Sequence, residues 1–368
     1  MTASVSYFTS GQIGNILIDS PPVNALSQHV RQGIVDALQT AAGDDTQIVV
    51  LRCEGRTFIA GADITEFGKP PQAPALATVL EALESHPKPV IAAIHGTALG
   101  GGLELALCCD YRIAALSAKV GLPEVNLGLL PGAGGTQRLP RLTGLEQAIE
   151  MITTGRPITA HDALTAGVLD EVCSGDPGEG ATAFAEALID KGAGKRLTRD
   201  IPLAITDDDT ALLSQARDTI AKRLKGQTAP QRILDCLEAA GTMAFDEGLA
   251  AERRAFEACM EDPQSTALRH LFFAERTASK IDGMAVGTEA QPVKHVGIIG
   301  AGTMGGGIAM CFAQSGFRVT LVDQDQEGLE RGLGIIKKNY EISVKRGRLS
   351  AEQVEGFLRN LEPTTDWQ

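Results

Sequence analysis

The fold is decided by residues 90–141, which read VIAAIHGTALGGGLELALCCDYRIAALSAKVGLPEVNLGLLPGAGGTQRLPR. An apolar run of strand type ends in a triple glycine at residues 100–102, and the apolar helix that follows carries Glu104 near its start. Glu124 comes directly after Pro123 in a loop rich in glycine and leucine. Two carboxylates in apolar, glycine-rich surroundings predict an acid/base pair beside a site where backbone N–H groups reach a ligand.

Strand and helix patterns alternate on the N-terminal side of this stretch. Residues 13–20 and 48–53 have the pattern of strands, and residues 28–40 and 75–85 have helical spacing. The run at 48–53 is apolar throughout, which is typical of a parallel strand covered on both faces. Residues 58–67 (FIAGADITEF) have the pattern of a further strand that leaves into a small-residue turn. The alternation predicts a parallel α/β sheet whose strand ends are available for function.

The composition places the chain among soluble globular proteins. Of the 368 residues, 43% are hydrophobic and 21% are charged, and the net charge is −13. An acidic balance spread along the chain argues against nucleic-acid binding, which needs a basic face. No signal peptide and no membrane span are predicted, and seven scattered cysteines without a CxxC pair fit a reducing compartment. These features predict a cytoplasmic protein without a metal site.

Two changes in pattern divide the chain into three predicted domains. The segment DPGEG at 176–180 is followed by almost continuous helical spacing, and the linker-like segment IDGMAVGTEAQP begins at residue 281. The predicted domains are residues 1–180, 181–290 and 291–368. The middle part is expected to consist of helices that pack on a flanking domain.

The third part opens with a strand, a glycine-rich turn, a helix and a second strand that ends at Asp323. Glycines at this position let the backbone approach a pyrophosphate at the start of the helix, and an acidic residue after the second strand binds a ribose hydroxyl. The pattern predicts NAD rather than NADP as the ligand; the alternative is a βαβ unit without a ligand. The predicted NAD-binding residues are Gly300, Gly302, Thr303, Met304, Gly305 and Asp323.

Several motifs resemble those of the enoyl-CoA hydratase/isomerase (crotonase) superfamily. They are PPVNALS at 21–27, FIAGADITEF at 58–67, AIHGTALGGGLELALCCDYRIA at 93–114, VGLPEVNLGLLPGAGGTQRLPRLTG at 120–144 and TGRPITAHDALTAGVLDEV at 154–172. With the helical middle part and the glycine-rich unit, the whole chain resembles the N-terminal part of the bifunctional enoyl-CoA hydratase/3-hydroxyacyl-CoA dehydrogenases of fatty acid β-oxidation. The resemblance implies an α/β crotonase domain (a ClpP-like spiral of ββα units), a helical linker and the first half of a Rossmann-type NAD-binding domain.

The resemblance also implies a mechanism. The substrate is a 2-trans-enoyl thioester of coenzyme A, and water adds across its double bond. The backbone N–H groups of Ala62 and Gly101 match the family's oxyanion hole. Glu104 matches the residue that activates the water, and Glu124 matches the residue that delivers a proton to the α-carbon. Helix position favours a charged Glu104, and apolar neighbours favour a protonated Glu124.

Other polar side chains near these motifs have simpler explanations. Cys108 and Cys109 are expected to be core residues, and His95 is expected to end a strand without a catalytic role. Glu81 and Glu84 have the spacing of a solvated helix face. The acyl chain length depends on the pocket near residues 67–75, which the sequence does not specify.

The third part departs from the resemblance because it is too short for two βαβαβ halves. Its length fits two strands and three helices, and no histidine follows His295. The family's dehydrogenase uses a histidine as its base, so dehydrogenase activity is not expected from this chain. The resemblance predicts a fragment of a longer protein, in which the dehydrogenase step is added; a natural short form is the alternative.

Competing functions remain at this point. The same fold isomerises 3-enoyl-CoA to 2-enoyl-CoA with one carboxylate, and the presence of both Glu104 and Glu124 favours hydratase activity with isomerase activity as a second possibility. A non-catalytic acyl-CoA or NAD binder is the alternative from another class. In the bifunctional enzymes the linker helices cover the hydratase domain, which predicts a monomer. The resemblance also allows a thiolase as a partner.

Overall fold

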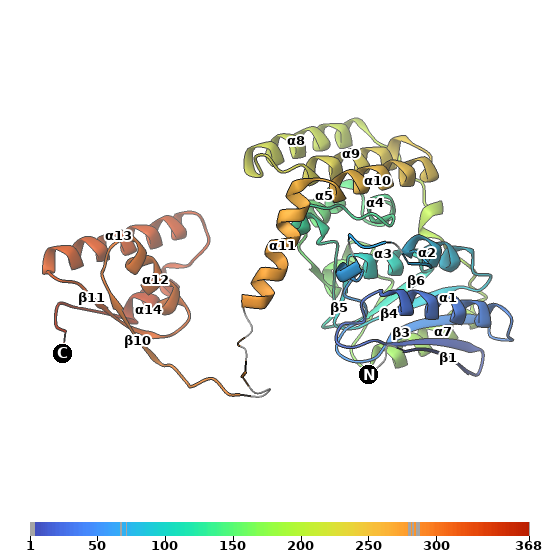
Figure 1. The fold of residues 1–368 in the computed structure, drawn as a ribbon, viewed down its shortest axis with the longest axis horizontal. Helices are drawn as coiled ribbons and strands as arrows, with labels where there is room; N and C mark the ends of the chain where they lie inside the picture. The colour runs from blue at the N-terminus through green and yellow to red at the C-terminus, as the bar shows by residue number, and fades with distance from the viewer. Residues whose placement is uncertain are drawn as a thin grey trace. The chain divides into compact units, whose positions relative to one another are not determined.

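The structure is a computed structural model that describes residues 4–66, 68–70, 72–278, 281, 283–284 and 288–367. The chain forms two compact units, Met1–Lys280 and Ile281–Gln368 (Figure 1). In the part of the chain described, no helix is both long enough and apolar enough to cross a membrane.

A six-stranded sheet is the centre of the first unit. Its strands are β1 (Ser4–Ser10), β2 (Ile13–Asp19), β3 (Ile48–Cys53), β4 (Val90–Ile94), β6 (Tyr111–Ala115) and β9 (Glu171–Cys173), and they lie side by side in that order. β1 pairs with β2 in the antiparallel sense, and all other neighbours are parallel. The predicted parallel α/β sheet is therefore confirmed.

Helices and short strands surround this sheet. The helices are α1 (Gln28–Ala42), α2 (Leu76–Ser85), α3 (Gly101–Cys108), α4 (Gly135–Thr143), α5 (Leu145–Thr154), α6 (Ala160–Thr165) and α7 (Pro177–Asp190). Short 3-10 helices are η1 (Ile64–Glu66), η2 (Glu124–Leu127) and η3 (Thr198–Asp200). A second sheet contains β5 (Thr97–Leu99), β7 (Lys119–Gly121) and β8 (Ile158–Thr159).

Burial on both faces explains the continuous apolar run of β3. Ile48 and Val50 pack in one hydrophobic cluster with residues of α7, whereas Val49 and Leu51 belong to the larger cluster on the opposite face. Successive side chains of a strand point to opposite faces, so both sets must be apolar when helices cover both sides.

The helical region follows η3, and its first three helices lie over α4 and α5. It contains α8 (Asp207–Arg223), α9 (Ala229–Thr242), α10 (Phe245–Met260) and α11 (Pro263–Ala278), and Figure 1 shows α8, α9 and α10 on the side of α4 and α5. α7 crosses the boundary predicted at residue 180, and its Ala181 and Ala185 pack against the six-stranded sheet. The division into three domains stays a prediction.

The second unit is a three-stranded parallel sheet with three helices. It contains β10 (His295–Ile299), α12 (Thr303–Gln314), β11 (Arg318–Val322), α13 (Gln326–Lys345), α14 (Ala351–Arg359) and β12 (Leu361–Thr364), with the strands in the order β10-β11-β12. The sequence analysis predicted two strands in this part of the chain, and the structure has three. β12 has the sequence LEPT, and only Leu361 is buried, so it lacks the apolar run that marks a strand.

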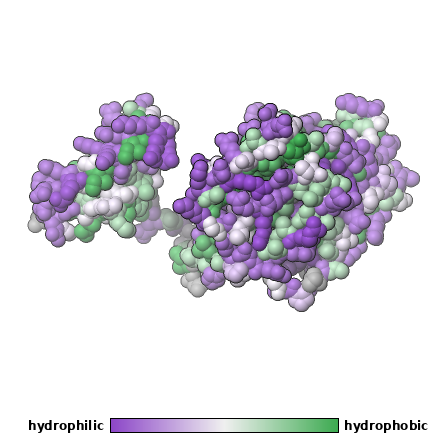
Figure 2. All heavy atoms as spheres, turned by 90° about the horizontal axis from the view of Figure 1, so that it is seen from above, coloured by the Kyte–Doolittle hydropathy of each residue, from purple (hydrophilic) through white to green (hydrophobic). Residues whose placement is uncertain are grey.

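Hydrophobic side chains reach the surface of the second unit. Ile299 on the edge strand β10 is 73% exposed, and Met304 and Ile308 in the first half of α12 are also exposed. Figure 2 shows hydrophobic atoms among the hydrophilic surface of this unit. The described residues of this unit therefore leave one edge of their sheet without an apolar cover.

Candidate active site

Two backbone turns of the first unit meet where the oxyanion hole is predicted. β5 ends at Leu99 and passes through Gly100 into α3, whose first residue is Gly101. Ala62 lies in the other turn and forms an isolated parallel bridge with Leu26. The amide nitrogen of Ala62 is 3.3 Å from the position that a Cβ on Gly101 would occupy. The structure therefore brings the two predicted N–H donors, Ala62 and Gly101, together.

Glu104 lies in the first turn of α3 and is only 3% exposed. Its Oε1 accepts hydrogen bonds from the backbone N–H groups of Ala133, at 2.8 Å, and Gly135, at 2.9 Å. Burial raises the pKa of Glu104, while these two hydrogen bonds and the positive charge of Arg138 oppose the increase. The helix start therefore does not by itself keep this carboxyl group ionised, and the two N–H donors supply the support that the sequence did not indicate.

Glu124 begins the 3-10 helix η2, which replaces the loop expected from the sequence. Its Oε1 is 2.8 Å from the position of a Cβ on Gly100, so the carboxyl group lies against the turn that leads to Gly101. Among the described residues, no hydrogen-bond partner reaches its buried Oε2. Burial, the charge of Glu104 and the charge of Glu252 raise the pKa of Glu124 well above its ordinary value.

These environments give the two carboxyl groups different properties. Glu104 is held by two N–H donors that stabilise its ionised form. Glu124 has an oxygen without a partner among the described residues and is destabilised when ionised. A pair of carboxyl groups whose surroundings separate their pKa values is suited to act as base and acid. The arrangement can therefore remove a proton at one position and deliver one at another.

A third buried carboxyl group, Glu252 of α10, was missed in the sequence. It is 1% exposed, and its oxygens accept hydrogen bonds from the backbone of Gly134 and from the backbone and hydroxyl of Thr136. Burial, together with the charge of Glu104, raises its pKa to about 8. The available signal was its position on the buried stripe of α10 with Gly248 and Cys259.

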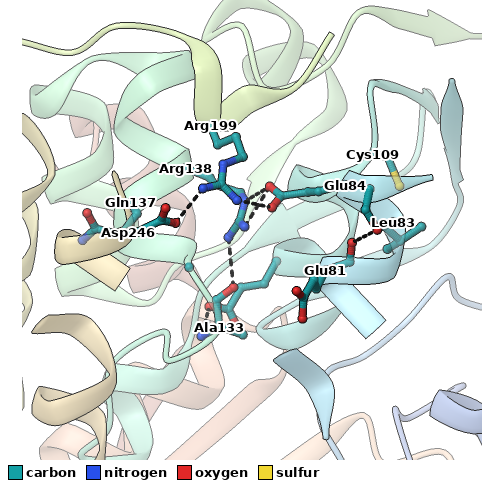
Figure 3. A network of polar contacts seen from close by, with 12 residues as sticks. Glu81, Leu83, Glu84, Cys109, Ala133, Gln137, Arg138, Arg199 and Asp246 are labelled. Atoms are coloured by element: carbon teal, nitrogen blue, oxygen red, sulfur yellow. Dashed lines mark hydrogen bonds and ion pairs between the residues drawn. The ribbon is translucent and has the colours of Figure 1, made fainter. Parts of the chain in front are cut away.

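Glu84 is buried, and the expectation that it lies on a solvated helix face was wrong. It is 8% exposed and forms ion pairs with Arg138, at 2.8 Å, and with Arg199, at 3.3 Å. Arg199 also pairs with Asp246 of α10, at 2.6 Å. Figure 3 shows how these side chains form one network beside Ala133. A buried carboxylate needs such partners to offset its lost hydration.

The remaining expectations near the site concern thiols and pocket shape. Cys108 and Cys109 are both buried in the main hydrophobic cluster, as expected for core residues. Phe67, which bounds the predicted acyl pocket, lies outside the described residues. Ala75, the other end of that segment, precedes α2.

The predicted NAD-binding residues lie together in the second unit. Gly300 has a φ of +95° and begins the turn after β10, and Gly302 precedes α12, whose first residues are Thr303, Met304 and Gly305. Asp323 follows β11, and its carboxylate accepts hydrogen bonds from the N–H of Ala301, at 2.7 Å, and of Gln324. These bonds lower the pKa of Asp323. A glycine turn at a helix start with an adjacent ionised carboxylate fits the adenosine half of NAD.

The sequence matches two family models. Residues 9–195 match the model "Enoyl-CoA hydratase/isomerase", and residues 295–368 match "3-hydroxyacyl-CoA dehydrogenase, NAD binding domain". Among solved structures, carnitinyl-CoA hydratase from Mycobacterium avium is similar with a TM-score of 0.56 and 29% identity, covering 75% of this chain and 97% of that one. The fold predicted for the first part is confirmed by this likeness.

Curated relatives extend over both units. The peroxisomal bifunctional enzyme of Danio rerio is 39% identical over 343 residues, which cover 91% of this chain and 47% of that protein. The peroxisomal bifunctional enzyme of Homo sapiens is 41% identical over 321 residues, 85% of this chain and 44% of that protein. The chain thus spans about half the length of the curated relatives it matches.

These names contradict one prediction. A cytoplasmic location was expected from the absence of a signal peptide and from the scattered cysteines, but the relatives are named peroxisomal. That prediction was wrong, because neither feature distinguishes a peroxisomal protein from a cytoplasmic one. The fold, the glycine-rich turn beside two carboxyl groups and the match over residues 9–195 agree with one another. The chain belongs to the enoyl-CoA hydratase/isomerase family.

Proposed function

We propose that the first unit hydrates 2-trans-enoyl-CoA thioesters to 3-hydroxyacyl-CoA thioesters, a step of fatty acid β-oxidation. The observation that carries the proposal is the meeting of two N–H turns with two carboxyl groups in different environments. A thioester needs donors for its oxygen, a base for water and an acid for carbon, and this site offers a candidate for each.

In the proposed reaction the thioester oxygen accepts hydrogen bonds from the N–H groups of Ala62 and Gly101. These donors stabilise the enolate that forms when water attacks, and preorganised donors of this kind are worth about 3–4 kcal/mol each. The position of Gly101 at the start of α3 adds a favourable helix dipole.

The two carboxyl groups divide the proton transfers in this proposal. Glu104 removes a proton from water, whose oxygen bonds to the β-carbon of the substrate. Glu124 gives its proton to the α-carbon as the enolate collapses to the thioester. After the product leaves, Glu104 gives its proton to solvent and Glu124 takes one up from solvent. One water molecule is therefore added to the substrate in each cycle.

Isomerisation of 3-enoyl-CoA to 2-enoyl-CoA is a second candidate activity at the same site. It needs one carboxyl group that removes a proton from the α-carbon and returns it to the γ-carbon. The oxygen of Glu124 without a partner favours this assignment. Hydratase activity remains the first assignment because isomerisation leaves Glu104 without a task.

For the second unit we propose binding of the adenosine half of NAD. In a longer protein, the nicotinamide of that NAD would accept a hydride from the 3-hydroxyacyl thioester. Gly300, Gly302 and Gly305 would approach the pyrophosphate, with Thr303 and Met304 in the same turn, and Asp323 would accept from the ribose. A monomeric state is supported by the layer that α8, α9 and α10 form over α4 and α5. A thiolase partner stays a prediction of the resemblance.

Loss of the enoyl-thioester absorbance of crotonyl-CoA, measured without NAD, tests the hydratase assignment. Glu104→Gln and Glu124→Gln are each expected to lower kcat by about 10²–10⁴-fold, the usual contribution of a general acid or base. Glu81→Gln, on the exposed side of α2, is the matched control and should keep the wild-type rate. Normal hydration by Glu104→Gln would overturn the proposed roles.

A further inference from the structure

Four successive backbone N–H groups are shared alternately between two glutamates. The N–H groups of Ala133 and Gly135 donate to Glu104, at 2.8 and 2.9 Å. Those of Gly134 and Thr136 donate to Glu252, at 2.6 and 2.9 Å. The segment 133–136 therefore has one carboxyl group on each side, one from α3 and one from α10.

The segment leads directly into α4, which begins at Gly135, so its N–H groups are those that no helical carbonyl can satisfy. Gly134 has a φ of +97°, a left-handed backbone conformation that favours glycine. A buried N–H group without an acceptor costs about 1–3 kcal/mol. Because Glu104 takes only alternate N–H groups, the segment needs a second acceptor to keep this shape.

The carbonyl side of the same segment is also held. Arg138 donates to the carbonyl oxygen of Ala133 at 3.2 Å, and Glu84 pairs with Arg138 (Figure 3). Ala133, whose N–H group donates to Glu104, is thus held at its carbonyl oxygen as well. Movement of the segment on the side of Glu252 would shift the two donors that fix Glu104.

We infer that Glu252 is a positioning residue for Glu104, and that α10 therefore belongs to the catalytic apparatus of the first unit and does not only cover it. This inference rests on the proposed hydratase function. Glu252 acts through the segment 133–136, which it holds from the side opposite to Glu104. Burial and the charge of Glu104 raise the pKa of Glu252, and the hydrogen bonds from Thr136 and Gly134 oppose that increase.

Glu252→Gln tests the inference because it keeps the volume of the side chain but replaces one acceptor oxygen by an N–H₂ donor. That donor would face N–H groups of Gly134 or Thr136, and the segment must shift. We expect kcat with crotonyl-CoA to fall by about 10–100-fold, the usual result of a small misplacement of a catalytic group, while KM changes little. Glu257→Gln, on the exposed side of the same helix, is the matched control.

Amide hydrogen exchange resolved by residue supplies a readout that does not depend on turnover. In Glu252→Gln, exchange should be faster at Ala133 and Gly135, which donate to Glu104 and not to Glu252. Faster exchange at Gly134 and Thr136 alone, or a kcat equal to that of Glu257→Gln, would overturn the inference. An inactive wild type would contradict the proposed hydratase function, and the exchange at Ala133 and Gly135 would still decide whether Glu252 holds the segment.

Thr136→Val provides a second variant if Glu252→Gln does not fold. It removes the hydroxyl that donates to Glu252 while it keeps the carboxyl group and the shape of the side chain. The expected changes are smaller and in the same direction: a lower kcat and faster exchange at Ala133 and Gly135. Wild-type values of both quantities in this variant would also overturn the inference.

Discussion

Gly100 meets two requirements at a single residue. Its φ of +52° with a ψ of −129° belongs to a region that only glycine adopts without strain. A Cβ at this position would also lie 2.8 Å from Oε1 of Glu124. The residue therefore fixes both the direction in which the chain enters α3 and the space in which the Glu124 carboxyl group lies.

Gly100→Ala should consequently affect both stability and activity. Backbone strain of about 1–3 kcal/mol is expected, and displacement of Glu124 should lower kcat by about 10–100-fold. Gly11→Ala is the matched control, because Gly11 has a φ of +58° and no atom of the described residues lies within 4 Å of its Cβ position. Urea denaturation should detect strain in both variants, whereas a hydration assay should detect a loss in Gly100→Ala alone; equal activities would contradict this account.

Glu252 also makes stability depend on pH. Its pKa in the folded protein is about 8, above its ordinary value of 4.5, so between these values the folded state binds more protons than the unfolded state. The free energy of unfolding should therefore fall as pH rises from 4.5 to 8. In Glu252→Gln this contribution is absent, so the fall should be less steep. Denaturant titrations across that range measure both slopes, and an unchanged slope in Glu252→Gln would reject the assignment.

At the scale of elements, α2, α4, η3 and α10 are joined by charged side chains. Glu84 of α2 pairs with Arg138 of α4 and with Arg199 of η3, and Arg199 reaches Asp246 of α10. The ring of Phe245 lies beside Arg138 and Arg199, with the guanidinium carbons 5.1 and 4.6 Å from its centre. The network therefore links the helical layer to the helices nearest the candidate site.

The position of a carboxylate in this network should decide how much its loss costs. Glu84→Gln leaves Arg138, which is 2% exposed, without its buried charge partner, and a loss of about 3–5 kcal/mol in the free energy of unfolding is expected. Asp246→Asn removes a partner whose side chain is 80% exposed, and a loss below about 1 kcal/mol is expected. Similar losses in the two variants, measured by urea denaturation, would show that burial does not determine the effect.

At the scale of the whole molecule, each unit has a hydrophobic cluster of its own. The clusters of the first unit include residues from Ile13 to Cys259, and that of the second unit includes residues from Ile298 to Leu361. All residues proposed for hydration lie in the first unit, and so does Glu252. The first unit is therefore expected to contain everything that hydration needs.

Two shortened chains test this expectation. Residues 1–280 should hydrate crotonyl-CoA with the kcat of the whole chain and should keep the melting temperature of the first unit. Residues 1–242 lack α10 and α11, and with them Glu252 and Asp246; this chain should lose most of the activity and unfold at a lower temperature. An inactive chain of residues 1–280, or a fully active chain of residues 1–242, would contradict the assignment.

Local sequence patterns predicted the parallel sheet, the family resemblance, and Glu104 and Glu124 as the candidate acid/base pair. These features depend on local patterns: apolar runs for buried strands, glycines for turns and motifs of fixed spacing. β12 escaped detection because a short strand with one buried residue carries no such pattern. The prediction of a cytoplasmic location was wrong because composition does not distinguish one reducing compartment of the cell from another.

The burial of Glu84 and Glu252 became apparent only in the folded structure. In the sequence both are single charged residues on helices, and solvent exposure is the usual state of such residues. Their burial depends on Arg138, which follows Glu84 by 54 positions, and on Gly134, which precedes Glu252 by 118 positions. Partners so distant in the chain are set by how helices pack on one another, and helix packing depends on the whole core rather than on any local pattern.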